Sequence, residues 1–208
     1  MISEKWMQIS NGKISNVYLL YGTEAYFIEE TIKKLKLKLE EDGEAEVIYF
    51  DLEEKNIEHV IYEADTLPFF SEKKLIIAKN AFFLKASEKG KEKIVHDTAL
   101  LESWLKDPSS TAIVVFVAPY DKLAERKKIT KAIKQTANVI EAAGLQIHDL
   151  KSWVLHEVSN EGKTITDEGI ERLIESGGTN LVHLRTEIAK ISTYSGEENV
   201  IDADTVKS

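Results

Sequence analysis

The turn after the first apolar segment is where residue types and spacing could support nucleotide chemistry. Residues 17–21 read VYLLY, as expected for a strand, and apolar residues recur at helical spacing from about residue 26 to residue 41. A turn between a strand and a helix can bind phosphate through backbone N–H groups and the helix N-terminus. Here the turn contains Gly22, Thr23 and Glu24, with one glycine, no lysine for the β and γ phosphates, and a carboxylate that would repel them. We therefore expect no phosphate binding at this turn.

The acid that would hold Mg²⁺ beside such a turn is also out of place. The apolar run over residues 111–117 predicts a buried parallel strand, and it continues into Ala118 and Pro119 instead of an acidic residue. Asp121 falls in the following turn, where an aspartate usually serves the turn itself. Because both halves of a Mg-nucleotide site are missing, the sequence predicts no ATPase activity and no cofactor.

Other catalytic and metal-binding arrangements are weak. The sequence has no cysteine, which excludes disulfides, thiolate metal sites and cysteine nucleophiles. Its five histidines form no HxxxH pair, and we interpret His59 and Glu63, four residues apart, as surface neighbours. There is no G-x-S-x-G nucleophile turn. We expect neither a hydrolase site nor a metal site.

The composition is that of a folded protein, and it limits the partners. Of the 208 residues, 43% are hydrophobic, which is enough for a substantial core. The lack of cysteine, of a signal peptide and of an uncharged run near the roughly 20 residues of a membrane span predicts a cytoplasmic protein. With 36 acidic and 27 basic residues, the net charge of −9 argues against the broad positive field that duplex DNA binding requires.

A basic segment interrupts this acidic background. Residues 123–136 have the apolar spacing of a helix, with Ile129, Ala132 and Ile133 able to face a sheet. The basic side chains could be the solvated face of this amphipathic helix, or they could bind DNA or a partner. The candidate residues for such a contact are Lys122, Arg126, Lys127, Lys128, Lys131 and Lys134.

The loop over residues 66–71, which reads TLPFFS, is unusually apolar. It follows a helix predicted over residues 57–64 and ended by Pro68, and it precedes a polar stretch over residues 72–74. Loops rarely carry so many apolar side chains. The phenylalanines could fold back onto the core, as buried Phe commonly does, or they could form an exposed plug for a partner's pocket.

Strands and helices alternate through the first two thirds of the sequence. Strands are predicted at residues 17–21, 45–50, 75–78, 111–117 and 138–141, and helices at 26–41, 57–64, 92–106 and 123–136. This order predicts an α/β domain over residues 1–143, with a parallel sheet sandwiched by helices.

The pattern changes after Gly144. Residues 147–158, 166–176 and 181–194 read as helices with no evident strand, and the last residues look like the start of a further helix capped by Asp202. We predict a small three-helix domain over residues 144–208.

Four stretches of the sequence resemble the delta subunit of the bacterial DNA polymerase III clamp loader. They are distributed over both predicted domains, and their order and spacing suit that family across nearly all of the chain. The stretches are VYLLYGTEAYFIEE, LPFFSEKKLIIAKN, VVFVAPYDKLAERKKITKAI and GGTNLVHLRTEIAKISTYSG.

The resemblance implies an AAA+-like (P-loop-like) domain with a degenerate nucleotide site, a lid domain, and a third, collar domain that is missing from these residues. The delta subunit is not itself an ATPase, although as part of the polymerase holoenzyme it would be grouped with DNA-directed DNA polymerases, a class of nucleotidyltransferase. In the family it binds the sliding clamp through an apolar plug and opens the ring for loading onto primed DNA, within a hetero-oligomeric ring of clamp-loader subunits.

On this sequence the plug falls on Leu67, Pro68, Phe69 and Phe70, and a polar rim on Glu63 and on Lys73 or Lys74. Two other hypotheses remain open from the residues. One is an enzyme with an unconventional P-loop-like nucleotide site, and the other is a DNA-binding module that uses the basic segment.

Overall fold

The computed structural model of the chain describes residues 2–43, 45–69, 71–86, 94–196 and 198–206. Its internal contacts divide into two compact units, residues 1–143 and residues 144–208. Within the described residues, no helix has both the length and the apolar character needed to cross a membrane.

The first unit is built on a five-stranded parallel sheet with the strand order β2-β3-β4-β1-β5. All seven residues of the central strand β4 are buried, which explains its near-continuous apolar sequence. The α/β fold with a parallel sheet predicted from the sequence is therefore confirmed. The strands are β1 (Val17–Tyr21), β2 (Ala45–Asp51), β3 (Lys73–Lys79), β4 (Ala112–Ala118) and β5 (Asn138–Glu141).

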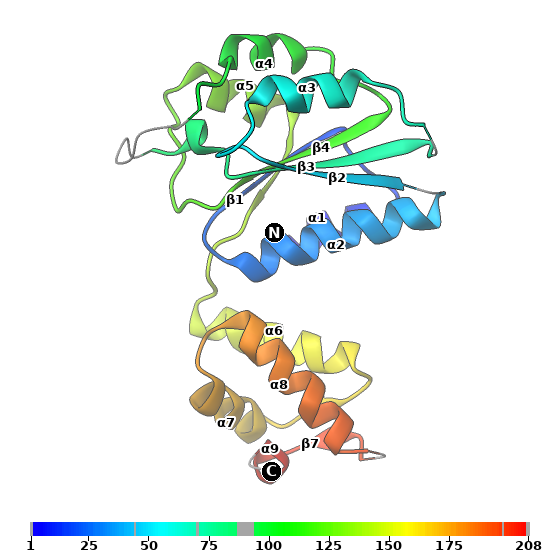
Figure 1. The fold of residues 1–208 in the computed structure, drawn as a ribbon. Coiled ribbons are helices and arrows are strands. Elements are labelled where there is room, and N and C mark those ends of the chain that lie inside the picture. Colours follow the sequence, from blue (N-terminus) through cyan, green and yellow to red (C-terminus); the bar gives the residue numbers. More distant parts are fainter. Residues whose placement is uncertain (1, 44, 70, 87–93, 197, 207–208) are drawn as a thin grey trace. The chain divides into compact units, whose positions relative to one another are not determined.

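Helices cover both faces of this sheet (Figure 1). One face carries α1 (Ile2–Ser10) and α2 (Ala25–Glu41), and the other carries α3 (Ile57–Asp65), α4 (Thr98–Trp104) and α5 (Lys128–Thr136). A short 3-10 helix, η1 (Phe82–Leu84), follows β3. The sequence pattern did not predict α1, which packs against α2 and donates a hydrogen bond from Trp6 Nε1 to Thr31 Oγ1 at 2.8 Å.

Two helices of the first unit begin later than the sequence pattern predicts. The helix predicted over residues 92–106 begins at Thr98, because the Asp97 side chain caps it by accepting a hydrogen bond from the N–H of Leu100 at 2.9 Å. Residues 92 and 93 lie outside the described residues. The cap thus shows that the prediction was wrong for residues 94–97, which precede the helix.

The basic helix predicted over residues 123–136 begins at Lys128. Leu123 forms an isolated bridge with Lys85, and the N–H of Lys127 donates to the carbonyl of Ala124 at 2.9 Å. These contacts make residues 123–127 a bridge and a turn instead of a helix. The basic segment is therefore split between a loop and α5.

The packing of α3 on the sheet determines where its end lies. Val60 and Ala64 of α3 belong to one buried cluster with Ile76 and Ala78 of β3. Because side chains alternate along a strand, Lys74 lies on the same face of the sheet as these two β3 residues. The last turn of α3 is thereby brought next to the beginning of β3.

The second unit contains three main helices, α6 (Ile147–Asn160), α7 (Asp167–Gly177) and α8 (Leu181–Tyr194). The prediction of no strand is wrong, because β6 (Thr164–Ile165) and β7 (Val200–Ile201) form a short parallel pair. Two-residue strands are too short to produce a periodic pattern in a sequence. A final short helix, α9 (Ala203–Val206), is capped as predicted by Asp202, whose Oδ1 accepts a hydrogen bond from the N–H of Thr205 at 2.9 Å.

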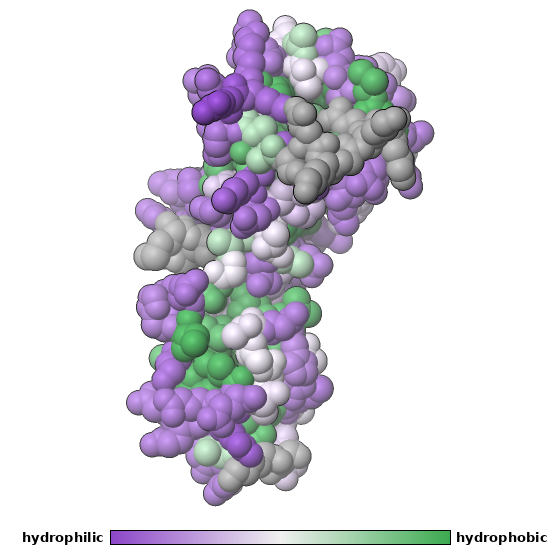
Figure 2. Space-filling model, turned by 90° about the vertical axis from the view of Figure 1, so that its left-hand side faces the viewer, coloured by the Kyte–Doolittle hydropathy of each residue, from purple (hydrophilic) through white to green (hydrophobic). Residues whose placement is uncertain are grey.

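The surfaces of the two units differ in character (Figure 2). On the face shown, hydrophilic side chains predominate on the first unit, whereas on the second unit hydrophobic side chains gather in a strip between hydrophilic borders. Exposed apolar residues of the second unit include Ile147, which is 66% exposed, and Leu155 and Val182. The second unit therefore has apolar surface of its own on α6 and α8.

Candidate functional site

The turn after β1 is closed by the backbone of the chain itself. Gly22 has a φ of +123°, and its N–H donates to the carbonyl of Ala118 at 3.2 Å. A Cβ at this position would lie 2.2 Å from the carbonyl oxygen of Ala142, so only glycine fits. The carbonyl of Ala142 also accepts a hydrogen bond from the N–H of Glu24 at 2.9 Å. Residues after β5 therefore pack directly onto the turn.

A carboxylate of the chain lies at the N-terminus of α2. Glu24 is the N-cap residue, and its Oε1 accepts a hydrogen bond from the N–H of Tyr26 at 3.2 Å. This is the position at which a bound phosphate would accept hydrogen bonds from a helix N-terminus. The negative charge that the helix end favours is supplied by Glu24, while Thr23 faces a neighbouring pocket.

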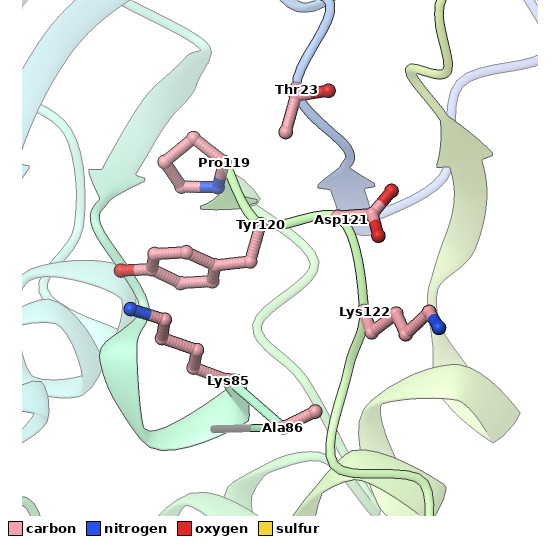
Figure 3. A pocket seen from close by; sticks show the side chains of 7 residues that line it. All are labelled: Thr23, Lys85, Ala86, Pro119, Tyr120, Asp121 and Lys122. Carbon is pink, nitrogen blue, oxygen red and sulfur yellow. The ribbon is translucent and has the colours of Figure 1, made fainter. Parts of the chain in front are cut away.

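A pocket of about 520 Å³ opens beside this turn at the carboxyl end of the sheet (Figure 3). The ammonium of Lys85 lies 5.3 Å from the ring centre of Tyr120. Figure 3 shows these two side chains next to each other in the pocket. Burial raises the pKa of the Tyr120 phenol to about 12, and the charges of Glu53 and Asp51 add to this effect. The lining residues are Thr23, Lys85, Ala86, Pro119, Tyr120, Asp121 and Lys122.

The acidic side chain of this pocket does not belong to a larger ligand cluster. Asp121 is exposed and lies in the bend after β4, as the sequence pattern indicates. Across the described residues, no group of three or more His, Asp and Glu side chains could hold a metal ion. The pocket has mixed charge, with Lys85 and Lys122 against Asp121.

The loop after α3 presents apolar side chains to solvent. Leu67 is 70% exposed and Phe69 is 82% exposed, while Pro68 is partly buried. Of the two alternatives for this loop, folding back onto the core is excluded for Leu67 and Phe69. Phe70, the fourth residue of the predicted plug, lies outside the described residues. Tyr62, on the preceding helix, is 75% exposed and adds a further aromatic side chain.

The polar residues predicted to surround this loop do not form one rim. Lys73 is exposed, but Lys74 is 1% exposed, and its ammonium makes an ion pair with the carboxylate of Glu63. The placement of Lys74 in an exposed rim is therefore wrong. Its charge can be buried because it is paired with Glu63. A second tie joins α3 to α4, where Trp104 Nε1 donates to Asp65 Oδ1 at 2.9 Å.

Several residues of the basic segment have partners within the chain. Lys127 donates to the carbonyl of Phe83 at 3.1 Å, Lys128 pairs with Glu102 at 2.7 Å, and Lys134 pairs with Glu125 at 2.6 Å. These three side chains thus serve contacts of the fold. The remaining basic residues of the segment, which are exposed, are Lys122, Arg126 and Lys131.

A groove of about 490 Å³ lies between α4 and α5. Lys106 of the turn after α4 lines it together with Lys128 and Lys131. Glu102 also lines the groove, so its charge is mixed but predominantly basic.

The region that contains the turn after β1 and the loop after α3 matches a known family. A sequence model of the family described as DNA polymerase III, delta subunit, matches residues 18–143, from β1 through β5. The chain belongs to the DNA polymerase III delta subunit family. The resemblance seen in the four sequence stretches is thereby confirmed.

Relatives extend the similarity over both units of this delta-family chain. DNA polymerase III subunit delta of Bacillus subtilis (strain 168) is 36% identical over 209 residues, which cover 100% of this chain and 60% of the relative. A probable DNA polymerase III subunit delta of Aquifex aeolicus (strain VF5) is 26% identical over 193 residues, covering 92% of this chain and 53% of the relative. The chain thus spans well under two thirds of the length of these relatives.

Solved structures show the same relationship and extend the fold. The Bacillus subtilis DNA clamp loader delta protein is similar with a TM-score of 0.84 at 36% identity, over 100% of this chain and 61% of the other. The Thermotoga maritima RuvB Holliday junction branch migration motor is similar with a TM-score of 0.55 at 10% identity, over 99% and 66%. The second likeness concerns the fold alone, and it agrees with the predicted AAA+/P-loop-like arrangement.

Some features of the site could not be found from the sequence. The sequence pattern places Tyr62 in a helix but does not show that it is exposed beside the loop. No neighbouring residue indicates that Lys74 is buried. The tie between Trp104 and Asp65 joins residues 39 positions apart. The one usable signal was the excess of apolar residues in the loop after α3.

Proposed function

We propose that this chain is the part of a DNA polymerase III delta subunit that binds the sliding clamp through Leu67, Pro68, Phe69 and Phe70. The observation that carries the proposal is the exposure of Leu67 and Phe69, at 70% and 82%, directly after the end of α3. Large apolar side chains that stay in solvent next to a well-packed helix are typical of anchors for a partner's pocket.

The two exposed anchors are not sufficient for tight binding on their own. Burying a large apolar side chain contributes about 1.5–3 kcal/mol, so Leu67 and Phe69 together supply about 3–6 kcal/mol. Association of two proteins costs at least a comparable amount, roughly 4–15 kcal/mol. Further contacts are therefore required. Two exposed residues flank the loop in the sequence, Tyr62 on α3 before it and Lys73 at the start of β3 after it. We propose these two residues, in place of Lys74, for the surroundings of the plug.

Clamp opening would follow from differential affinity. A ligand shifts a conformational equilibrium only by binding one state better than the other. The apolar loop would therefore bind the open clamp better than the closed one, and the free energy of this preference would drive the opening.

The chain would perform this work without hydrolysing ATP. Support comes from the turn after β1, where Ala142 packs against Gly22 and the Glu24 carboxylate caps α2. ATP-dependent steps would then come from other subunits of a hetero-oligomeric ring. In this proposal residues 1–143 are an AAA+-like domain with a degenerate nucleotide site, and residues 144–208 are its lid.

The groove between α4 and α5 favours a second contact, with the phosphates of primed DNA inside the assembly. Lys106 and Lys131 line it, and among the described residues that line the groove the one acidic side chain, Glu102, pairs with Lys128. In the assembled loader, Lys131→Ala is expected to reduce the salt dependence of DNA binding by about one phosphate contact, a change of about 0.9 in the logarithmic slope. Lys33→Ala is the control, because this exposed lysine lies on α2, which covers the opposite face of the sheet. An unchanged slope for both variants would remove this groove from the DNA contact.

The test of the main proposal is clamp binding by purified chain, measured by surface plasmon resonance. Phe69→Ala with Phe70→Ala should weaken binding at least tenfold, as expected for central anchors. Tyr194→Ala, which removes an aromatic side chain that is 70% exposed on the second unit, is the matched control and should leave binding unchanged.

The stability of each variant is measured in parallel. Because Phe69 is 82% exposed, its truncation should lower the free energy of unfolding by no more than about 1 kcal/mol. Equal clamp affinity of the parent and of the double variant would show that the plug is assigned to the wrong residues. Tight Mg-dependent ATP binding by the parent would instead favour the nucleotide-dependent alternative.

A further inference from the structure

A buried lysine at the start of β3 contacts the end of α3. Lys74 is 1% exposed, and lysine is rarely buried to this degree unless it is paired. Its ammonium makes an ion pair with the carboxylate of Glu63 and also donates a hydrogen bond to the backbone carbonyl of Glu63 at 3.2 Å. Two groups of one residue in the last turn of α3 thus converge on a single buried cation.

This contact satisfies a helix end from outside the helix. The last four carbonyls of a helix have no intrahelical partner, and the C-terminus carries partial negative charge. The carbonyl of Tyr62 accepts a hydrogen bond from the N–H of Thr66 at 3.1 Å, and the carbonyl of Glu63 accepts one from Lys74. A cationic side chain near a helix C-terminus is favourable for both reasons. Here the cation belongs to the sheet, so the helix end is attached to the sheet.

The same contact closes the base of the loop. Glu63 lies in the last turn before the loop and Lys74 is the second residue of the strand after it. We infer that Lys74 is a positioning residue for the apolar side chains of Leu67 and Phe69 and acts through Glu63. This inference rests on the clamp-binding function proposed above.

The consequence of this closure is a loop that is ordered before it binds. Ordering a loop during association lowers affinity, and a surface that is competent in only a fraction of the molecules raises the apparent Kd by the inverse of that fraction. The tie between Trp104 and Asp65 fixes the last residue of α3 from α4. This tie attaches the end of the helix to α4, whereas Lys74 attaches it to β3, the strand to which the loop leads.

The inference predicts a local effect of Lys74→Met, which keeps an unbranched side chain and removes the charge. In the free chain, hydrogen exchange at the N–H of Thr66 should become about tenfold faster, because the end of α3 opens more often. Clamp binding should weaken about tenfold, because fewer molecules present the loop in the binding geometry. The milder Glu63→Gln, which keeps the backbone contact, should give both effects in the same direction and smaller.

A control variant separates positioning from general destabilisation. Leu35 is fully buried in α2 on the opposite face of the sheet, so Leu35→Ala destabilises the first unit without touching α3. It should leave clamp affinity within about twofold of the parent as long as the chain is folded. In a chain that already carries Phe69→Ala, Lys74→Met should cause a clearly smaller further loss, because Leu67 is then the one exposed anchor left for it to position, whereas a purely structural role would weaken both backgrounds equally.

The two measurements also separate this inference from the proposed function. If Lys74→Met leaves both the exchange of Thr66 and the clamp affinity unchanged, Lys74 does not position the loop. The same conclusion follows if the loss of affinity is equally large in the Phe69→Ala background or in Leu35→Ala. If the parent binds no clamp, the proposed function is wrong, and the exchange at Thr66 alone decides whether Lys74 fixes the end of α3.

Discussion

The turn after β1 and the loop after α3 use opposite arrangements. The turn is filled by the chain itself, with the carbonyl of Ala142 against Gly22 and the carboxylate of Glu24 at the helix N-terminus. The loop is held at its base by Glu63 and Lys74, and its side chains of Leu67 and Phe69 are exposed. In the turn after β1, residues of the chain occupy the position where a ligand could bind. In the loop after α3, large apolar side chains are left exposed.

The physical reason for this difference lies in what each segment can bind within the chain. A helix N-terminus favours an anion, and a glutamate of the chain meets that preference without any ligand. The exposed side chains of Leu67 and Phe69, in contrast, would gain further free energy from burial in a partner's pocket. Substitutions can test both regions. Those in the turn test how tightly it is packed, and those at the end of α3 test how firmly the helix is attached.

The largest effect is expected for Gly22→Ala. The added Cβ would lie 2.2 Å from the carbonyl oxygen of Ala142, and the φ of +123° is unfavourable for alanine. We expect a loss of about 2–4 kcal/mol in the free energy of unfolding, measured by urea denaturation. Gly43→Ala is the control, because Gly43 has a φ of +148° and no atom within 4 Å of the added Cβ. Equal losses for both variants would mean that strain, and not contact with Ala142, is what the turn avoids.

Next comes the tie between α3 and α4. Trp104→Phe removes the indole N–H that donates to Asp65 Oδ1 at 2.9 Å. The expected loss of stability is about 1–1.5 kcal/mol, the usual value for one such hydrogen bond. Asp65→Asn keeps an acceptor oxygen and should cost less. Should Asp65→Asn be as damaging as Trp104→Phe, the hydrogen bond would not be the contact that matters.

A smaller effect is expected at the N-terminus of α2. Glu24→Ala removes the acceptor for the N–H of Tyr26 and should lower stability by about 0.5–1 kcal/mol. Glu24→Gln, which keeps an acceptor oxygen, should lose less. Neither variant should gain measurable ATP binding by isothermal titration calorimetry, because the turn has no lysine for the phosphates. Tight ATP binding by Glu24→Ala would show that the carboxylate alone closes the turn.

The smallest effect concerns the pocket next to the turn. The pKa of Tyr120 is raised to about 12, so its contribution to stability is complete below about pH 10 and is lost as the pH rises through about 12. The difference in ultraviolet absorbance between the parent and Tyr120→Phe should therefore follow an ionisation near pH 12. Glu53→Gln, which removes one of the neighbouring carboxylates, should lower that midpoint. A difference titration centred at pH 10 would indicate that the phenol is in contact with solvent.

Much of the fold followed from local patterns. The five strands were predicted within a few residues of their observed bounds, because alternation with helices and a buried apolar run are properties of each segment. The starts of α4 and α5 were missed. Asp97 caps α4 with its side chain, so the helix begins after it. Leu123 forms a bridge with Lys85, a residue far away in the sequence, and α5 therefore begins later than predicted.

The candidate site divides in the same way. The turn at Gly22 and the apolar loop at Phe69 can both be recognised in the sequence, because the turn lacks the residue types that phosphate binding requires and the loop has an excess of apolar ones. The sequence could not distinguish Lys73, which is exposed, from Lys74, which is buried. They differ only in the face of β3 from which they project and in what packs on that face.

By itself the sequence determined the order of the five sheet strands, the family and the absence of a lysine from the turn after β1, since these depend on residue types and their spacing. Only the tertiary structure decided that Leu67 and Phe69 stay in solvent while Lys74 is buried against Glu63. The physical reason is that exposure and ion pairing are set by residues far apart in the chain, through the packing of α3 on the sheet.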